Sequence, residues 1–277
     1  MKKFHMNPRT ITALALSTIG TFIHAQTPES KPLGYQDTPI IPGTKWHVHD
    51  GERPQPIIIT PGENSTQSTP GTAPSDAIVL FNGKDLSMWK NHSDGQPAWK
   101  VDNGHIEISP KRGGLTTAGE YGPDIQLHIE WSAPQPASGN GQGRGNSGVL
   151  FFGKYEVQVL DSYENKTYPD GQAASLYGFM PPLVNATRPP GAWNIYDIIF
   201  NGARFESDRL VSPTILTVIH NGVVVQNHIA IPGPTTHKGL PTYKPHPEKG
   251  PIVLQDHGNP VRYRNIWLRE LKPVDSK

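Results

Sequence analysis

The chain has 277 residues, with 28 glycines, 29 prolines, no cysteine and a formal net charge of +1 at pH 7. Disulfides are therefore excluded, and a nearly neutral chain without a long basic run gives no electrostatic basis for binding nucleic acid. The abundant glycine and proline, with no sustained helical period, favour a domain of short strands and many turns.

The N-terminus, residues 1–25, has the pattern of a secretory signal. Three basic residues precede an apolar stretch over residues 11–23, and Ala25 provides a small residue at the cleavage site. An uncleaved anchor is the alternative, although the stretch is short for a membrane span. We expect a periplasmic or secreted protein, with no membrane span in the mature chain.

Residues 26–75 are rich in Pro, Gly, Ser and Thr and predict an arm or linker. Such a composition cannot bury enough apolar surface to fold alone. The apolar residues around Trp46 and over Ile57–Ile59 are unusual for a pure linker, so we expect the arm to lie against the main domain. The folded domain is placed at residues 76–277.

From Asp76 onward the pattern predicts antiparallel strands. Residues 77–81 form an apolar strand-like run, and residues 99–108 and 216–225 each contain an Asn-Gly pair between two strand-like segments, as in tight hairpins. The predicted fold class is all-β, a sandwich of two antiparallel sheets packed face to face.

The most informative segment is Tyr155–Asp161, which alternates polar and apolar residues. Side chains of a strand repeat every two residues, so Glu156 and Gln158 share one face while Tyr155, Val157 and Val159 share the other. A polar face on an apolar platform suits a site that binds sugars, although solvent-facing residues of a one-sided sheet would show the same pattern.

Two further strands offer polar groups that could lie on the same sheet face. Glu130 belongs to the polar register of residues 125–131, and Gln255 follows the apolar run before it, with His257 at the strand end. A histidine before a glycine can also merely cap a turn. We predict that carboxylate, amide and imidazole groups from these strands meet at one site.

Four other residues are candidates for substrate binding: Asn146, Tyr177, Asn194 and Arg262. Three of them have a structural alternative: a turn for Asn146, loop packing for Tyr177 and, for Asn194, a place beside Tyr196 on the strand face opposite Trp193. Arg264, two residues beyond Arg262, is expected to be a partly buried cation paired with a carboxylate.

Several motifs in order resemble the 3-keto-disaccharide hydrolase domain family over about residues 76–271. They are Leu80–Trp89, Asn146–Val149, Tyr155–Asp161, Trp193–Asn194, Leu254–Gly258 and Arg264–Ile266. The resemblance implies a concanavalin-like jelly roll whose concave sheet carries the site, and secreted bacterial carbohydrate processing. The extension through Gly43–Asp50 and Arg53–Pro54 also resembles a subgroup of that family.

The segment from Glu156 is similar in spacing to the Glu-x-Asp-x-x-Glu pattern of jelly-roll glycosidases, but it has Gln158 and Asp161 at the other two positions. That departure weakens ordinary retaining hydrolysis, which needs two nearby carboxyl groups. A 3-keto sugar offers another route, because its ketone acidifies the hydrogen on C2 and a base can start an elimination of the C1 substituent. Hydration, or net hydrolysis, would follow.

His257 is a candidate base near neutral pH, with Glu156 as the alternative base or acid. The amides of Gln158, Gln255 and Asn194 are candidate partners for hydroxyls. No cofactor is certain; a divalent metal ion on Glu130, Glu156 and His257 is an alternative that would polarise the ketone.

A non-catalytic carbohydrate-binding module is the competing interpretation. Such a module needs aromatic platforms but no titrating base at the site. Clustering of Glu130, Glu156 and His257 would favour the enzyme, and their dispersal would favour a lectin.

Overall fold

The computed structural model describes residues 33–93 and 95–272, so the predicted signal, residues 1–25, lies outside the described residues. The chain divides into two compact units, Met1–Gln55 and Pro56–Lys277. In the smaller unit, bridges pair Gly34 with Asp50 and Ile40 with His47. Among the described residues, none forms a helix with the length and hydrophobicity to cross a bilayer.

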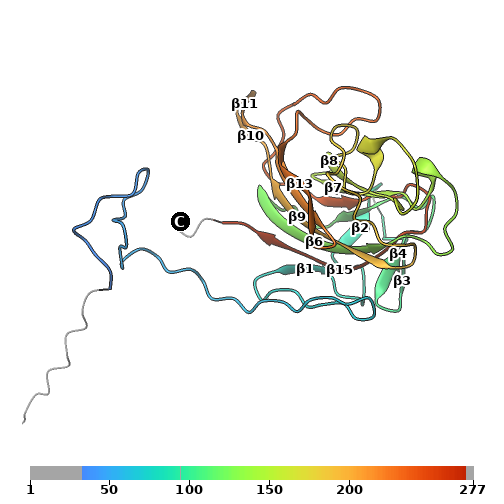
Figure 1. Ribbon diagram of the computed structural model, residues 1–277, viewed down its shortest axis with the longest axis horizontal. Coiled ribbons are helices and arrows are strands. Elements are labelled where there is room, and N and C mark those ends of the chain that lie inside the picture. Colours follow the sequence, from blue (N-terminus) through green and yellow to red (C-terminus); the bar gives the residue numbers. More distant parts are fainter. Residues whose placement is uncertain (1–32, 94, 273–277) are drawn as a thin grey trace, which may run out of the picture. The chain divides into compact units, whose positions relative to one another are not determined.

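The larger unit is the predicted all-β sandwich of two antiparallel sheets with jelly-roll architecture (Figure 1). One layer has eight strands, in the spatial order β13 (Val223–Ala230), β12 (Ile215–His220), β9 (Trp193–Asn201), β6 (Asp124–Ser132), β15 (Arg262–Glu270), β4 (His105–Glu107) and β3 (Lys100–Asp102), with β1 (Ile78–Phe81) also paired to β15.

The other layer has five strands, in the order β2 (Trp89–Asn91), β5 (Leu115–Thr117), β14 (Ile252–Leu254), β7 (Ser147–Phe151) and β8 (Tyr155–Val159). A separate two-stranded ribbon joins β10 (Arg204–Glu206) to β11 (Arg209–Ser212), and two 3-10 turns lie at η1 (Gly141–Gly143) and η2 (Pro169–Gly171).

Both predicted Asn-Gly hairpins are confirmed. Asn103 and Gly104 connect β3 to β4 with φ of 47° and 78°, and Asn221 and Gly222 connect β12 to β13 with φ of 53° and 82°. Two consecutive positive φ angles match the right-handed twist of the flanking strands, and Asn and Gly adopt them at little cost.

The core lies between the two layers and is formed by alternate residues of their strands. Phe151 of the five-stranded sheet stacks on Phe200 of the eight-stranded sheet, with ring centroids 4.5 Å apart. The layers are also joined by two buried hydroxyls, because Tyr196 donates to the Gln158 carbonyl oxygen at 2.8 Å and Tyr263 donates to Ser147 Oγ at 2.7 Å. The backbone of β8 is therefore held from the core side.

The outer face of the eight-stranded sheet is covered by the segment at residues 62–74. Arg264 donates to Glu130 Oε2 at 2.8 Å and to the carbonyl oxygen of Thr66 at 2.6 Å, so one cation joins two strands to the covering segment. Arg264 also lies over the Trp193 ring, 4.2 Å from its centroid. The expectation that Arg264 is a buried cation paired with a carboxylate is confirmed.

A β-bulge in β15 places Arg264 on this outer face. The pairing of β15 with β6 shifts register between Arg264 and Trp267, and Asn265 has a φ of 46°. An extra residue in one strand reverses the face of every following side chain, so Ile266 and Leu268 point to the core although they share the parity of Arg264.

Candidate active site

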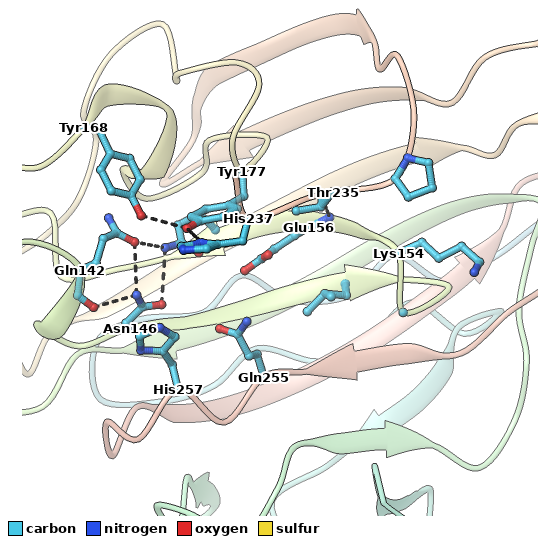
Figure 2. Close-up of a pocket in the computed structure, with 14 residues that line it drawn as sticks. Gln142, Asn146, Lys154, Glu156, Tyr168, Tyr177, Thr235, His237, Gln255 and His257 are labelled. Carbon is cyan, nitrogen blue, oxygen red and sulfur yellow. Dashed lines mark hydrogen bonds between the residues drawn. The ribbon is translucent and has the colours of Figure 1, made fainter. Parts of the chain in front are cut away.

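A cavity of about 490 Å³ lies on the face of the five-stranded sheet that is turned away from the core. Six of the predicted site residues line it: Asn146, Glu156, Gln158, Tyr177, Gln255 and His257. Figure 2 shows the Glu156 carboxylate projecting into the space between His237 and Gln255. The volume suits a small ligand such as a sugar.

Strand alternation in β8 positions the two central side chains as predicted. Tyr155, Val157 and Val159 are fully buried in the core, so Glu156 and Gln158 project to the cavity side. The cross-strand partner of Gln158 is Gly148, and a Cβ there would lie 2.3 Å from Glu156 Oε1. A glycine in β7 is therefore required to leave room for the carboxylate.

Glu156 is a buried carboxylate with little to stabilise its charge. Its residue is 6 % exposed, and burial raises the pKa of Glu156 to about 7. In the described part of the chain no cation pairs with it within 4 Å. When the Gln158 amide is rotated by 180°, its nitrogen lies 3.1 Å from Glu156 Oε1. A carboxyl group poised near neutral pH can both take and return a proton.

Amide side chains form one wall beside Glu156. Gln142, from η1, accepts from Asn146 Nδ2 at 3.2 Å through its side-chain oxygen. In the unrotated orientation of the Gln158 amide, the same oxygen also accepts from Gln158 Nε2 at 3.0 Å. The Asn146 amide also donates to the Gln142 carbonyl oxygen at 2.8 Å. These contacts hold three neutral groups in place, as binding of hydroxyls requires.

Two tyrosines and a histidine from loops line the cavity on the side next to Gln142 (Figure 2). The Tyr177 hydroxyl lies 2.8 Å from the Tyr168 hydroxyl and 3.2 Å from His237 Nδ1, and the His237 ring stacks nearly parallel to Tyr177 at an interplanar angle of 8°. Burial, followed by the bond to Tyr168, raises the pKa of Tyr177 well above its usual value. Tyr177 is therefore a neutral hydroxyl at neutral pH, with a proton to donate.

Gln255 and His257 come from the end of β14. The backbone N–H of Gln255 donates to the Gly148 carbonyl oxygen, which fixes the residue beside β7. Its side-chain Oε1 is buried and has no hydrogen-bond partner among the described residues, so it can accept from a ligand. His257 is exposed at the cavity mouth.

The prediction that Glu130 belongs to this site is wrong. Glu130 is on β6 of the other sheet, 0 % exposed, and faces the segment at residues 62–74. Burial alone would raise the pKa of Glu130, but hydrogen bonds with His128, Ser65, Asn265 and Arg264 outweigh it and lower the pKa to about 2. Glu130 is a structural anion.

Asn194 and Arg262 also do not line the cavity. Asn194 points into the core side of β9, where its side-chain oxygen accepts from the Arg188 backbone N–H at 2.9 Å and lies 3.2 Å from His220 Nε2. Arg262 lies on the eight-stranded sheet and pairs with Glu107 at 2.9 Å. Both residues belong to the other sheet layer. The alternation of polar and apolar residues along a strand does not indicate to which sheet the strand belongs.

The proposed metal ligands Glu130, Glu156 and His257 are therefore not brought together. In residues 33–93 and 95–272 no group of three or more His, Cys, Asp or Glu side chains has the arrangement to hold a metal ion. The test that would separate enzyme from lectin gives a divided result, since two of its three residues share the cavity. The perturbed Glu156 carboxyl, rather than the full trio, distinguishes this cavity from a simple binding surface.

Residues 76–269 match the 3-keto-alpha-glucoside-1,2-lyase-like domain family, which is 194 of 277 residues. The chain belongs to this family. The match begins where the sequence placed the start of the folded domain, and it contains every residue of the cavity that has been described above.

Known proteins similar to this family member include one curated relative and two solved structures. The relative, from Bacteroides thetaiotaomicron, is described as a 3-keto-disaccharide hydrolase and is 24% identical over 237 residues, which is 70% of this chain and 78% of its own. A candidate glycosyl hydrolase from Parabacteroides distasonis is 44% identical, with a TM-score of 0.76 over 84% of this chain and all of its own. Another from the same organism, at 20% identity and a TM-score of 0.53 over 71% of this chain and 94% of its own, shows the shared fold.

Five polar residues of the cavity in this family member were not predicted from the sequence: Gln142, Lys154, Tyr168, Thr235 and His237. Four of them lie in loops or at turns, where no strand period assigns a face. Gln142 lies in a Gly-rich loop at residues 139–145, which reaches the cavity. For His237, in a Pro-rich loop, the sequence holds no comparable signal.

Proposed function

We propose that this protein cleaves 3-keto-glycosides, with Glu156 as the base that removes the proton from C2. The single observation that carries the proposal is a buried carboxyl group in a sugar-sized cavity, with a pKa raised to about 7. Membership of the 3-keto-alpha-glucoside-1,2-lyase-like family and the relative described as a 3-keto-disaccharide hydrolase support a keto sugar as substrate.

The reaction begins when the C2–H bond breaks and the proton passes to Glu156. The electron pair forms an enolate between C2 and C3, with negative charge on the former ketone oxygen. As the C3 carbonyl forms again, a C1=C2 double bond forms and the C1–O bond breaks. The leaving oxygen takes up a proton, and addition of water across C1 and C2 then gives net hydrolysis.

A second carboxylate is not needed for this route, and the cavity fits that requirement. Asp161, at the last position of the glycosidase-like spacing, does not line it; its carboxylate is paired with Arg144 at 2.7 Å. Conventional retaining hydrolysis requires two carboxyl groups about 5 to 5.5 Å apart. Since Gln158 is an amide, Glu156 has no such partner on its strand.

The other polar groups can be assigned by their protonation state. Tyr177 is the donor to the leaving oxygen, because its hydroxyl is neutral and is held by Tyr168 and His237. Gln255 offers an unpaired acceptor for a sugar hydroxyl. The side-chain oxygen of Asn146 is a second acceptor, because both of its N–H groups already donate to Gln142. His257, the base first considered from the sequence, lies at the mouth, where binding of the substrate edge is the role that we propose.

The decisive experiment compares 3-keto disaccharides with their unoxidised parents, each with and without a chelator. We expect far faster cleavage of the keto substrate, because without the ketone the C2 hydrogen is too weakly acidic for a carboxylate. In deuterium oxide the hydrated product should carry deuterium at C2. Comparable rates on both substrates with no label at C2 would replace this function with conventional glycosidase chemistry.

The chelator arm tests the metal alternative directly. Loss of activity on chelation, with recovery when a divalent ion is added back, would show that the cavity uses a metal with fewer protein ligands than the sequence suggested. Unchanged activity would leave Glu156 and Tyr177 to act without one.

We also propose that the protein is exported, because residues 1–25 carry a secretory pattern. N-terminal sequencing of the protein from a producing cell should give a mature chain that starts near Gln26. A chain that retains Met1 and remains in the cytoplasm would contradict this proposal.

A further inference from the structure

A second recess adjoins the catalytic cavity on the same face of the five-stranded sheet. It has a volume of about 260 Å³ and shares Leu150, Gly153 and Gln255 with the cavity. Its other lining residues include His92, Val253 and Asp256. The shared residues make the two spaces parts of one groove across the sheet.

The strand register aligns this groove with Glu156. Glu156 of β8 pairs with Leu150 of β7, Leu150 pairs with Val253 of β14, and Val253 pairs with Thr116 of β5. Neighbouring strands lie about 4.8 Å apart, so Val253 is about 10 Å from Glu156 along this row. A ligand with one ring over Glu156 and another beyond it would therefore extend over Leu150 and Val253.

The recess has the chemistry of a surface for a ring with an apolar face. Leu150 and Val253 give it an aliphatic floor, while His92 and Asp256 give it polar edges. His92 Nδ1 lies 2.9 Å from Thr116 Oγ1, so Nε2 is the ring nitrogen that remains for a ligand. Asp256 accepts from the backbone N–H groups of Arg112 and Gly113 and so fixes the wall.

Gln255 marks the junction between the two spaces. Its buried Oε1 has no partner among the described residues, and burying an unpaired acceptor is costly, so a hydroxyl donated by the ligand would stabilise it. The other side of the catalytic cavity is bounded by Gln142, Tyr168, Tyr177 and His237. For a keto sugar bound among those groups, the row toward Val253 offers space for its C1 substituent.

We propose that the recess is the subsite for the leaving group, and that it takes a second pyranose ring or an aryl group stacked on Leu150 and Val253. This inference rests on the proposed function, since it requires the ring that is cleaved to lie over Glu156. A pyranose and an aryl ring both have an apolar face that can pack on these two side chains. Substrates that carry one or the other as leaving group distinguish the two occupants.

The test measures kcat/KM for three substrates: a 3-keto disaccharide, an aryl 3-keto-glucoside and methyl 3-keto-glucoside. Val253→Phe adds bulk to the floor of the recess. We expect the ratio of kcat/KM for the large substrates to that for the methyl substrate to fall at least on the order of tenfold. Of the two large substrates, the one that loses more kcat/KM in Val253→Phe carries the kind of leaving group that the recess binds.

Two further variants keep the test decisive. Val211→Phe, on the exposed β11 of the two-stranded ribbon, is the matched control and should leave the ratio unchanged. If Val253→Phe does not fold, Val253→Thr keeps the volume, adds a hydroxyl to the floor and should lower the same ratio. An unchanged ratio in a folded Val253 variant would overturn the subsite, whereas wild-type protein that cleaves no keto substrate would overturn the proposed function instead.

Discussion

The two buried glutamates on strand faces, Glu130 and Glu156, have the same side chain in opposite environments. Glu130 is bonded to Arg264, Asn265 and Ser65 beneath a covering segment, which lowers its pKa to about 2. Glu156 faces a cavity without a cation, and burial raises its pKa to about 7. The first is permanently charged and structural, whereas the second can exchange a proton near neutral pH.

The comparison shows that burial alone does not identify a catalytic carboxylate. Both residues have almost no exposed surface, so desolvation opposes the charge of each. What differs is the number of partners that stabilise the charged form. A buried carboxylate that has them contributes to the fold, and one that lacks them is available for chemistry.

The largest expected effect is the loss of activity in Glu156→Gln. The variant keeps the shape but cannot accept a proton, so kcat on a 3-keto disaccharide should fall by a factor on the order of 10² to 10⁴. Its thermal unfolding at pH 8 should be unchanged or shifted upward, because a buried charge is removed. A folded variant with near-normal kcat would end the assignment of Glu156 as base.

The corresponding change on the other sheet should affect stability instead. Glu130→Gln leaves the Arg264 cation buried without its partner, so the free energy of unfolding should fall by about 3 to 5 kcal/mol in urea titrations. The activity of the remaining folded protein should stay close to wild type.

Glu107→Gln is the matched control, because it breaks the more exposed pair with Arg262 and should cost less than about 1 kcal/mol. Equal losses of stability in the two variants would contradict the distinction between a buried and a partly exposed pair.

The pH dependence of stability provides a further contrast through His128, which lies 2.7 Å from Asp197 and stacks on Trp267. Burial would lower the pKa of His128, but bonds to Asp197 and Glu130 raise it from 6.5 to about 9. The stability from this charged histidine is complete below pH 6.5 and is lost as pH rises toward 9. The loss should be on the order of 1 to 3 kcal/mol.

Chemical denaturation at pH 6.5 and 9 should show this decrease in wild type and a much smaller one in His128→Gln. His228→Asn, at an exposed histidine, should behave as wild type. A wild-type slope that persists in His128→Gln would assign the titration to another group.

The smallest expected effect concerns the pH profile of kcat/KM. The informative quantity is the pH at which kcat/KM reaches half of its plateau value. A base with a pKa of about 7 predicts that kcat/KM rises with pH and levels off above pH 7. A midpoint between pH 4 and 5 would show that Glu156 is solvated in the free enzyme. A raised pKa would then no longer distinguish Glu156 from Glu130 as the catalytic carboxylate.

The local geometry of the strands and turns follows from the sequence alone. The period of two places Glu156 and Gln158 on one face, and the Asn-Gly pairs fix two hairpins, because both depend only on neighbouring residues. The order of motifs also identified the family before any contact was known.

Which strand faces meet at one site follows from the folded domain and not from the local pattern. Glu130 and Glu156 both lie at polar positions of their strands, yet they are on the outer faces of different sheets. The bulge after Arg264 reverses the face on which the following side chains of β15 lie. His237 and Tyr168 enter the site from loops. Alternation fixes a side chain relative to its own strand, whereas pairing, bulges and loop paths depend on contacts between residues far apart in the chain.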